Sequence, residues 1–458
     1  MPRLALMGTL AIASMAAPAA ASAADRVWIE GRGFGHGIGL SQEGARGFAA
    51  HGFDYRRILG HYYRGTAVRR LSSGRSVRVL LSSGGPAAFS GASDVGGVRL
   101  MPGRTYTAAA LPGGRLEVRL GGGAVARGPS PLRVRGAGPL NVAGGTYRGI
   151  LDLGAVPGGV QVVNELGLED YVRGVVSAES PASWPIQALK AQAVAARGYA
   201  VTTSHGGGFD QYADTRSQVY RGVAAETART DAAVRATRGE VVTYRGRAVT
   251  TYFFSTSGGH TENVEDSFVG ADPKPWLRGV PDPYEGRAPL HTWRRGPFAR
   301  SQLRAKLGDW VKGSFVRVAV TKRGASPRIV HAVVVGTRGR TRVTGPELKA
   351  RLGLPDTWAS FVDVSTEPAP AGPPLIAAVG LGAGVRASAL AARAVRGAVA
   401  GGGRGARLAV QVRGRHGRWR RVTTTRLRAG GDYAAVVPRA GTYRVRYRGL
   451  DGPPVSVR

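Results

Sequence analysis

Residues 163–176 read VNELGLEDYVRGVV, and residues 188–197 read ALKAQAVAAR. In the first stretch, Glu169 and Asp170 stand just before the apolar residues of a short helical pattern. Acidic side chains favour the first turn of a helix because they interact with the positive end of the helix dipole. The second stretch repeats small and apolar residues at helical spacing. These two stretches therefore predict consecutive helices.

The second helix is predicted to begin with Ser183 as its N-cap and Pro185 in its first turn, and to run to about Val201. Glu179 lies between the two helices, in the sequence VVSAESPASWP (175–185). Partial desolvation would raise the pKa of this carboxyl group towards the range useful for proton donation. The alternative is a capping or salt-bridging surface glutamate, which is natural in so arginine-rich a chain.

Strand patterns flank this region on both sides. Glycine accounts for 70 of 458 residues, which favours turn-rich β structure over a helical bundle. Short strands are predicted at 77–81, 116–120, 132–135 and 160–163. Helices are predicted at 45–49, 58–62, 227–237, 298–307 and 344–352, and hairpins join 241–244 to 249–254 and 315–320 to 330–335. The expected fold class is α+β, with a β-rich unit surrounded by several helices.

The C-terminal part of the chain has a different pattern. Residues 367–375 have the proline-rich composition of a linker. Alternating strands at regular spacing follow, at residues 407–412, 419–427, 433–437 and 443–447. This pattern predicts an all-β, Ig-like sandwich over 376–458. The sandwich is either a passive stabilising domain or a module that docks onto a polymer or another protein.

Residues 1–24 have the pattern of a cleavable secretory signal peptide. A basic start precedes an apolar run, and the segment ends in the small-residue sequence ASA (21–23). No later stretch reaches the ~18 apolar residues that a membrane-spanning helix needs. The expected location is therefore secreted or in the cell wall, without a stable transmembrane anchor.

Composition excludes several kinds of site. The chain has no cysteine, which removes disulfides, thiolate–zinc sites and cysteine nucleophiles. Its formal net charge is +35, but the arginines are spread along the chain rather than gathered around aromatic platforms. This distribution argues against a nucleic-acid partner and fits either attraction to an anionic polymer, such as a cell wall, or an arginine-biased composition. No metal site or cofactor is predicted, because no HxxxH or HExxH pair occurs.

Two glycine-rich blocks could carry polar chemistry. Residues 35–42 read GHGIGLSQ, and residues 255–263 read STSGGHTEN. The first lacks the Gly-Lys-Ser/Thr ending of a phosphate loop, which argues against a nucleotide site. Small hydroxyl residues and paired glycines in the second let backbone amides approach a polar ligand closely. The competing interpretation of the first block is a packing turn in which the interior makes the hydrogen bonds of His36. The competing interpretation of the second block is an ordinary hairpin loop.

Together these blocks resemble the SpoIID/LytB family, which comprises stage II sporulation protein D and the amidase enhancers. The resemblance rests on residues 163–176 and 188–197, on SQVYRG (217–222), on SGG (257–259) and on GHGIGLSQ (35–42). It covers about residues 27–363. Three features depart from the family: the GHG block leads the chain instead of ending the domain, the zinc-binding cysteines of some members are absent, and Glu43 and Ser180 stand where an aromatic residue and a methionine are usual.

The resemblance implies cell-wall chemistry within a SpoIID/LytB-like domain at 25–366, with a β-rich insert at about 75–163. Sporulation members of the family are lytic transglycosylases that cut peptidoglycan glycan strands, preferably those without stem peptides, and their catalytic glutamate matches Glu179. One carboxyl group suffices, since it first protonates the glycosidic oxygen and then deprotonates the 6-hydroxyl of the sugar. The implied glycan-binding residues are His36, Ser41, Gln42, Gln192, Arg197, Ser217, Gln218, Tyr220, Ser255, Ser257, Gly258, Gly259 and Thr261. The alternative function is a non-catalytic, peptidoglycan-binding activator of a cell-wall amidase.

Overall fold

The computed structural model describes residues 26–72, 74–286, 288–368, 393–400, 402–414 and 416–457. These residues form two units. The larger comprises residues 30–294 and 304–360, and the smaller comprises the other described residues. Strands β1 (Arg26–Gly31), β20 (Trp293–Phe298) and β24 (Ala359–Val364) run from one unit into the other. The predicted signal peptide and most of the predicted linker lie outside the described residues. Within the described ranges, no helix has the length and apolar character needed to cross a membrane.

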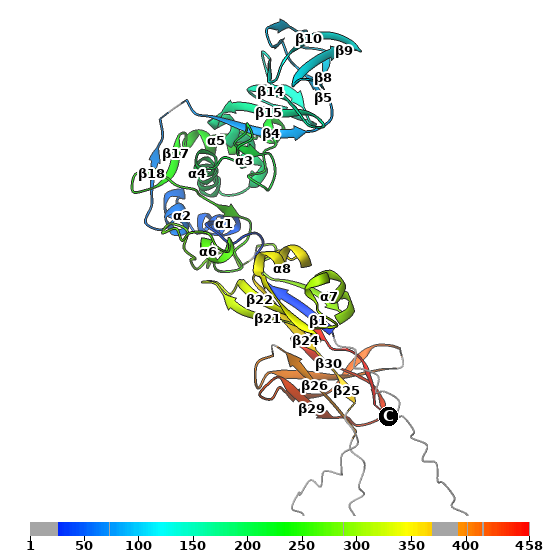
Figure 1. The fold of residues 1–458 in the computed structure, drawn as a ribbon. Coiled ribbons are helices and arrows are strands. Elements are labelled where there is room, and N and C mark those ends of the chain that lie inside the picture. Colours follow the sequence, from blue (N-terminus) through cyan, green and yellow to red (C-terminus); the bar gives the residue numbers. More distant parts are fainter. Residues whose placement is uncertain are drawn as a thin grey trace, which may run out of the picture. The chain divides into compact units, whose positions relative to one another are not determined.

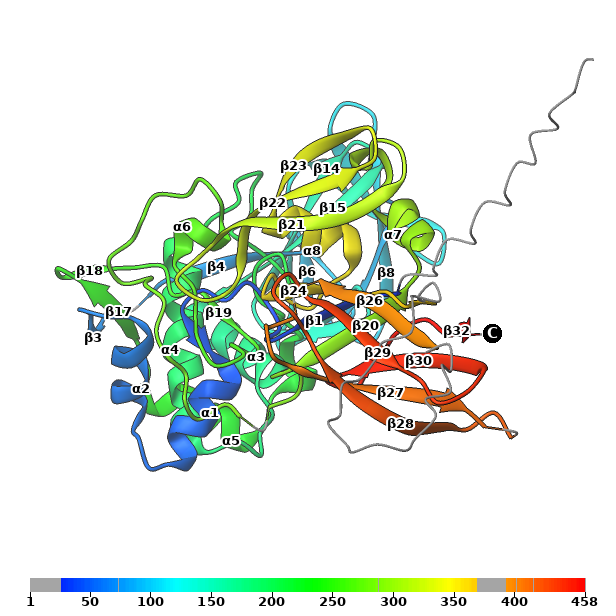
Figure 2. The same ribbon diagram turned by 90° about the horizontal axis from the view of Figure 1, so that it is seen from below.

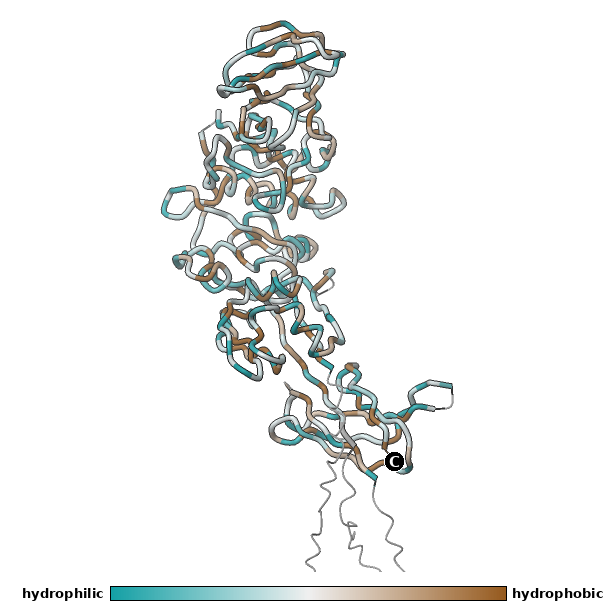
Figure 3. Tube along the Cα trace, turned by 45° about the vertical axis from the view of Figure 1, so that its right-hand side comes forward, coloured by the Kyte–Doolittle hydropathy of each residue, from teal (hydrophilic) through white to brown (hydrophobic). Residues whose placement is uncertain are grey.

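Two mainly antiparallel sheets form the β-rich part of the larger unit (Figure 1). Their inner faces share one core that includes Val79, Phe89, Leu116 and Leu153. Buried and exposed positions alternate along β8 (Thr105–Leu111), and hydrophobic and hydrophilic residues mix along these strands in Figure 3. The first sheet has the order β16 (Gln211–Tyr212), β4 (Ser76–Ser83), β15 (Gly159–Gly167), β14 (Ile150–Val156), β11 (Leu132–Arg135), β6 (Asp94–Val95), β7 (Val98–Arg99). The second has the order β10 (Gly123–Pro129), β9 (Arg115–Leu120), β8 (Thr105–Leu111), β5 (Ala87–Ser90), β12 (Leu140–Val142), β13 (Gly145–Tyr147).

A helical layer packs next to these sheets around α4 (Ile186–Thr202). Both predicted helices are present, since α3 (Leu168–Glu179) begins with the expected acidic turn. The predicted N-cap of α4 was wrong: Pro185 holds that position, and Ser183 lies in a turn closed by the Trp184 N–H and the Pro181 carbonyl. Alanines make α4 narrow, so helices can approach it closely on several sides. These helices are α1 (Gln42–Ala50), α2 (Tyr55–Tyr62), α3 and α5 (Ala228–Ala236) (Figure 2).

The segment after α5 differs from the predicted hairpin. Strand β17 (Glu240–Tyr244) pairs with β3 (Ala67–Arg70) and with β18 (Arg247–Ala248), but residues 249–254 do not continue that sheet. Thr251 instead donates its hydroxyl hydrogen to the Ala195 carbonyl of α4 at 2.7 Å. The chain then forms β19 (Phe253–Phe254), which pairs in parallel with β2 (Leu40–Ser41). This pairing places the leading glycine-rich block beside the chain that follows α4.

The last part of the larger unit is a three-stranded antiparallel sheet. Its strands are β21 (Phe315–Arg323), β22 (Ile329–Gly336) and β23 (Gly339–Thr344), of which sequence analysis missed the third. Helix α8 (Gly345–Leu352) follows directly, with Thr344 and Glu347 forming a capping box. The remaining short helices with described ends are α6 (Val264–Ser267), α7 (Arg300–Leu307), η1 (Gly222–Ala225) and η2 (Gly308–Trp310).

The smaller unit contains two sheets that share an apolar core, which includes Val364, Val410, Tyr433 and Val445. In the first sheet β26 (Ala394–Ala400) pairs with β24, β25 (Glu367–Pro368) and β29 (Asp432–Val436). The second contains β28 (Trp419–Arg426), β27 (Arg407–Arg413), β30 (Gly441–Tyr447), β31 (Leu450–Asp451) and β32 (Val455–Val457). The four strands predicted here are present. The predicted α+β, β-rich fold class is confirmed.

Candidate active site

Three separate segments of the chain meet at the carboxyl group of Glu179. This residue is the last of α3, and the turn through Pro181 begins immediately after it. Glu179 Oε1 accepts a hydrogen bond from the Val219 N–H at 2.8 Å, and Oε2 accepts one from Gln42 Nε2 at 3.1 Å. Burial raises the pKa of Glu179, and the two hydrogen bonds oppose that rise only in part. The group therefore keeps its proton to a higher pH than an exposed glutamate does.

Glu179 lies in a cleft of about 630 Å³ within the larger unit. Among the described residues that line it, Glu179 is the only Asp or Glu. Aromatic rings form much of the wall, and Phe34 and Phe268 remain 46% and 37% exposed. The lining residues are Phe34, Gly35, His36, Gln42, Glu179, Tyr199, Thr215, Arg216, Ser217, Tyr252, Phe253, Phe254, Ser255, Phe268 and Lys349. The cleft thus combines one protonatable carboxyl group with broad apolar surfaces.

His36 lines the cleft as a neutral side chain with both ring nitrogens engaged. Nδ1 accepts a hydrogen bond from the Ile38 N–H, so Nε2 carries the hydrogen and donates it to the Phe253 carbonyl at 3.0 Å. Burial, with the nearby positive charge of Lys349, lowers the pKa of His36 to about 3. The ring packs against Tyr252, Phe254 and Phe268. His36 therefore fixes the leading block against β19 and does not titrate near neutral pH.

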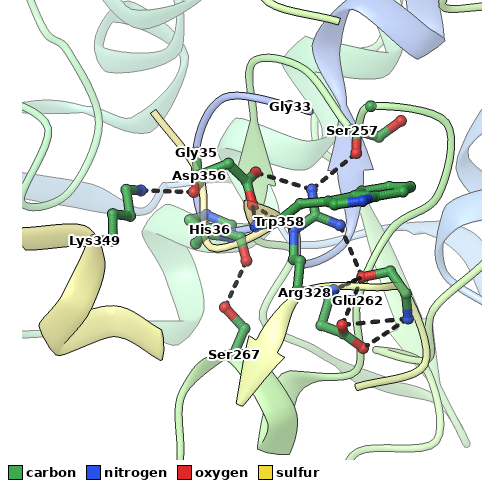
Figure 4. Close-up of polar contacts among 12 residues, drawn as sticks. Gly33, Gly35, His36, Ser257, Glu262, Ser267, Arg328, Lys349, Asp356 and Trp358 are labelled. Carbon is green, nitrogen blue, oxygen red and sulfur yellow. Dashed lines mark hydrogen bonds and ion pairs between the residues drawn. The ribbon is translucent and has the colours of Figure 1, made fainter. Parts of the chain in front are cut away.

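A buried ion pair lies beneath this block (Figure 4). Arg328 donates from Nε and Nη2 to the two carboxylate oxygens of Asp356 at 2.8 and 2.9 Å. The same guanidinium donates to the carbonyls of Ser257 and His260 at 2.8 and 2.7 Å. A Cβ at Gly37, which has φ +83°, would lie 2.6 Å from Arg328 Nε. Glycine is needed here because the backbone touches the guanidinium directly.

A second buried carboxylate joins the two glycine-rich blocks. Glu285 accepts hydrogen bonds from the Ser41 hydroxyl at 2.8 Å, from the Gly258 N–H at 2.7 Å and from the Ser257 N–H. Asp282 lies nearby, and burial together with the charge of Glu285 raises the pKa of Asp282 to about 7. The blocks at 35–42 and 255–263 are therefore held together by side chains that come from a third segment.

The structure brings five of the predicted site residues to the cleft: His36, Gln42, Glu179, Ser217 and Ser255. The other nine do not line it, and most of them instead hold its walls in place. Arg197 is fully buried and pairs with Glu169 at 2.9 Å, and the Tyr220 hydroxyl donates to Asn164 at 2.9 Å. The residues outside the lining are Ser41, Gln192, Arg197, Gln218, Tyr220, Ser257, Gly258, Gly259 and Thr261. A direct glycan contact by these nine residues is not supported by their positions.

Sequence reasoning missed several residues that shape the site. Tyr199, Arg216 and Lys349 line the cleft, and Lys349 Nζ donates to the Gly35 carbonyl at 2.6 Å. Arg216 adjoins the SQVYRG block, so its position was a usable signal. No local pattern marks Lys349 or the pair Arg328–Asp356, because their importance arises only from contacts with distant segments.

Comparison with known proteins gives the family of this region. The model of the family described as SpoIID, stage II sporulation protein, matches residues 157–244. The chain contains a SpoIID-family domain. This finding confirms the predicted resemblance for the segment that carries Glu179, whereas the leading block lies outside the matched residues.

Three relatives illustrate the extent of the similarity. An uncharacterized protein of Brachyspira hyodysenteriae (strain ATCC 49526 / WA1) is 44% identical over 123 residues, which are 26% of this chain and 33% of that protein. Stage II sporulation protein D of Bacillus subtilis (strain 168) is 36% identical over 152 residues, 29% of this chain and 43% of that protein. The amidase enhancer of the same strain is 39% identical over 102 residues, 22% of this chain and 14% of that protein. The chain thus spans less than half the length of each of these three relatives.

Proposed function

We propose that this protein acts on the bacterial cell wall as a peptidoglycan lytic transglycosylase, with Glu179 as its acid and base. The SpoIID domain and the names of the relatives support a cell-wall role. The observation that carries the proposed reaction is the single carboxyl group with a raised pKa in an aromatic-lined cleft. A glycoside hydrolase ordinarily needs two carboxyl groups about the scissile bond.

The reaction requires one proton to leave Glu179 and one to return. Protonated Glu179 gives its hydrogen to the glycosidic oxygen, and the bond from that oxygen to the anomeric carbon breaks. The resulting carboxylate then takes the hydrogen of the 6-hydroxyl of the same sugar, whose oxygen bonds to the anomeric carbon. The products are a new chain end and a 1,6-anhydro sugar, and Glu179 is again protonated. No water is consumed, so no second carboxylate is needed to activate one.

The hydrogen bonds of Glu179 determine which oxygen carries the proton. A backbone N–H can only donate, so Oε1 must accept from Val219 in either protonation state. The proton of the acid form therefore resides on Oε2, beside Gln42. Rotation of the Gln42 amide by half a turn presents its oxygen to that hydrogen, since the two ends of the amide are nearly the same in shape. Gln42 can thus bond to both forms, but it favours the carboxylate, because the rotation breaks the bond from Nε2 to the Glu179 carbonyl.

The aromatic wall suits a polysaccharide substrate. Phe34, Tyr252 and Phe268 offer ring faces against which the apolar faces of sugars pack. Ser217, Ser255 and Thr215 supply hydroxyl groups along the same cleft. The leading block contributes His36 and Gln42, and Phe34 stands directly before it, so the permuted order of the motifs is compatible with one assembled site.

The test is mass analysis of products after incubation with purified glycan strands lacking stem peptides. Wild type is expected to release fragments with anhydro ends, and Glu179→Gln is expected to reduce release by at least about 100-fold. Glu43→Gln is the matched control, because Glu43 lies in the first turn of α1 next to Gln42 but does not line the cleft and pairs with Arg46. Reducing ends in place of anhydro ends, or activity retained by Glu179→Gln, would refute the proposed mechanism.

A second candidate is a non-catalytic glycan-binding protein that stimulates a cell-wall amidase. The similarity to a protein named amidase enhancer favours it. This candidate requires that wild type releases no anhydro fragments and that Glu179→Gln stimulates an added amidase as well as wild type does. The same product analysis, repeated with an amidase present, therefore separates the two candidates.

A further inference from the structure

The sheet formed by β21, β22 and β23 has one covered face and one open face. Helix α8 packs against β22 and β23, with Leu348 and Leu352 buried. The strand residues that point to the covered side include Val318, Val334 and Val343, all nearly inaccessible to solvent. The strand residues on the opposite, open side belong to the larger unit, and none of them lines the cleft.

The register of the three strands places three arginines on the open side of this sheet. Arg317 of β21, Val335 of β22 and Arg340 of β23 are directly paired in one row across the sheet. In the next row along that face Ala319, Val333 and Arg342 are paired in the same way. All three arginines are exposed, and the apolar residues between them are half-buried. We call this surface the basic sheet face; it consists of Arg317, Ala319, Val333, Val335, Arg340 and Arg342.

The charge of this surface is not neutralised by neighbouring carboxylates. None of its three guanidinium groups forms an ion pair with any residue that the structure describes. Between Arg304 and Leu352 the sequence has twelve Lys and Arg residues but only Asp309 and Glu347 as acids. Positive charge is therefore denser here than in the chain as a whole, whose 458 residues carry +35.

Basic residues also line a groove that includes the turn between β22 and β23. It encloses about 630 Å³ and is lined by Arg304, Lys312 and Arg338, among others. Arg338 lies in the turn between β22 and β23, two residues before Arg340. The one acid in the groove lining, Asp309, is already paired with Arg351 at 3.2 Å. Arg338 therefore places further positive charge near Arg340, at the start of β23.

We propose that the basic sheet face binds a flexible phosphodiester polymer that carries no bases. Guanidinium groups pair with phosphate oxygens through two parallel hydrogen bonds, which favours arginine over lysine at such sites. Arg340 and Arg342 are two positions apart on one strand, so their backbone positions are roughly 7 Å apart. Arg317 and Arg340 lie two strands apart, so the spacing between their backbone positions is roughly 10 Å. An extended chain of phosphates can reach these groups in turn.

The absence of aromatic residues from this face decides against single-stranded nucleic acid. Proteins that bind single strands stack the bases on aromatic side chains, and the six residues of the basic sheet face include none. Val333 and Val335 instead offer small apolar contacts that suit a polyol backbone. This binding site is separate from the cleft, so it stands whether or not Glu179 is catalytic.

The experiment measures the affinity of the full chain for soluble poly(glycerol phosphate), with a single-stranded DNA oligonucleotide as the comparison probe. In the test variant, Arg317, Arg340 and Arg342 are all replaced by Gln. The matched control replaces Arg69, Arg99 and Arg115 by Gln, since these are also exposed and removing them changes the net charge equally. All six side chains are on the surface, so both variants should keep the wild-type melting temperature.

We expect the test variant to lose at least tenfold in affinity for poly(glycerol phosphate) and the control to change less than about threefold. The slope of log affinity against log salt concentration should be shallower by about two in the test variant, because three phosphate contacts are lost. Equal losses in both variants would overturn the proposal, because they would indicate attraction by net charge alone. Tighter binding of the oligonucleotide than of poly(glycerol phosphate), abolished in the test variant, would overturn it in favour of a nucleic-acid partner.

Discussion

Replacing Asp356 by Asn should destabilise the larger unit strongly. Asp356 and Arg328 have side chains 0% and 1% exposed, and the aspartate receives two guanidinium hydrogen bonds and the Trp358 N–H at 2.8 Å. Asparagine has nearly the same size, so packing is preserved, but the buried guanidinium loses its counter-charge. Breaking a buried pair by removing one partner costs about 3–5 kcal/mol in the free energy of unfolding.

A loss of this size corresponds to a decrease in melting temperature of roughly 10 °C for a domain of a few hundred residues. The assay is thermal and urea unfolding of the full chain, followed by intrinsic fluorescence, since Trp358 lies 5.4 Å from the Arg328 guanidinium. Cleft activity is measured in parallel below the melting temperature. It should fall too, because Arg328 holds the carbonyls of Ser257 and His260 beside the leading block.

Asp309→Asn is the matched control for this prediction. Asp309 also pairs with an arginine, Arg351, but its side chain is 76% exposed, so its loss should cost less than about 1 kcal/mol. A double variant with Arg328→Met and Asp356→Leu should recover part of the stability, because it removes the uncompensated charge. The reasoning is wrong if Asp356→Asn lowers the melting temperature no more than Asp309→Asn does.

Three further predictions concern the cleft and its glycines. Burial raises the pKa of Glu179 in the folded state, so its ionisation reduces stability as the pH rises through that raised pKa. Glu179→Gln should therefore have a higher melting temperature than wild type at pH 8. A difference in melting temperature that does not shrink towards pH 4 would contradict this prediction. Gln42→Leu removes a hydrogen bond that favours the carboxylate form of Glu179. The alkaline limb of the pH–rate profile should therefore move to higher pH, while the maximal rate falls about tenfold. An unchanged limb would count against the hydrogen bond from Gln42 to Glu179. Gly37→Ala should lower the free energy of unfolding by more than about 2 kcal/mol, because its Cβ would meet the Arg328 guanidinium. Gly52→Ala, with a similar φ of +85° but no atom within 4 Å of the added Cβ, should lower it by about 1 kcal/mol. Equal losses would show that backbone strain alone matters.

Local sequence patterns predicted most of the regular structure. The acidic first turn of α3, the small-residue spacing of α4 and the alternation of the C-terminal strands are all read over a few residues. Errors arose where distant contacts overrule local preference. Residues 249–254 have a strand pattern, yet Thr251 bonds to α4 and Phe253 pairs with Leu40, so these residues do not extend the short hairpin of β17 and β18. Ser183 lies inside the turn that is closed by the Trp184 N–H, so Pro185 holds the N-cap position of α4 instead.

The candidate acid could be named from the sequence, because a glutamate between two helices beside prolines and a tryptophan is a local feature. Its partners could not. Gln42 and Glu179 are 137 residues apart, and only the folded chain shows that the leading block reaches the carboxyl group. Glu285, Arg328, Asp356 and Lys349 carry no pattern at all, since a buried charge is identified by what surrounds it.

The amino-acid sequence by itself determined most of the secondary structure, the family of the central segment and the identity of the candidate acid, since each depends on residues close together in the chain. Tertiary structure decided which polar residues face the cleft and which support it, because burial and hydrogen bonding depend on segments that meet only after folding. It also decided that Arg317, Arg340 and Arg342 share one open face, since strand register, rather than composition, sets which side chains are neighbours.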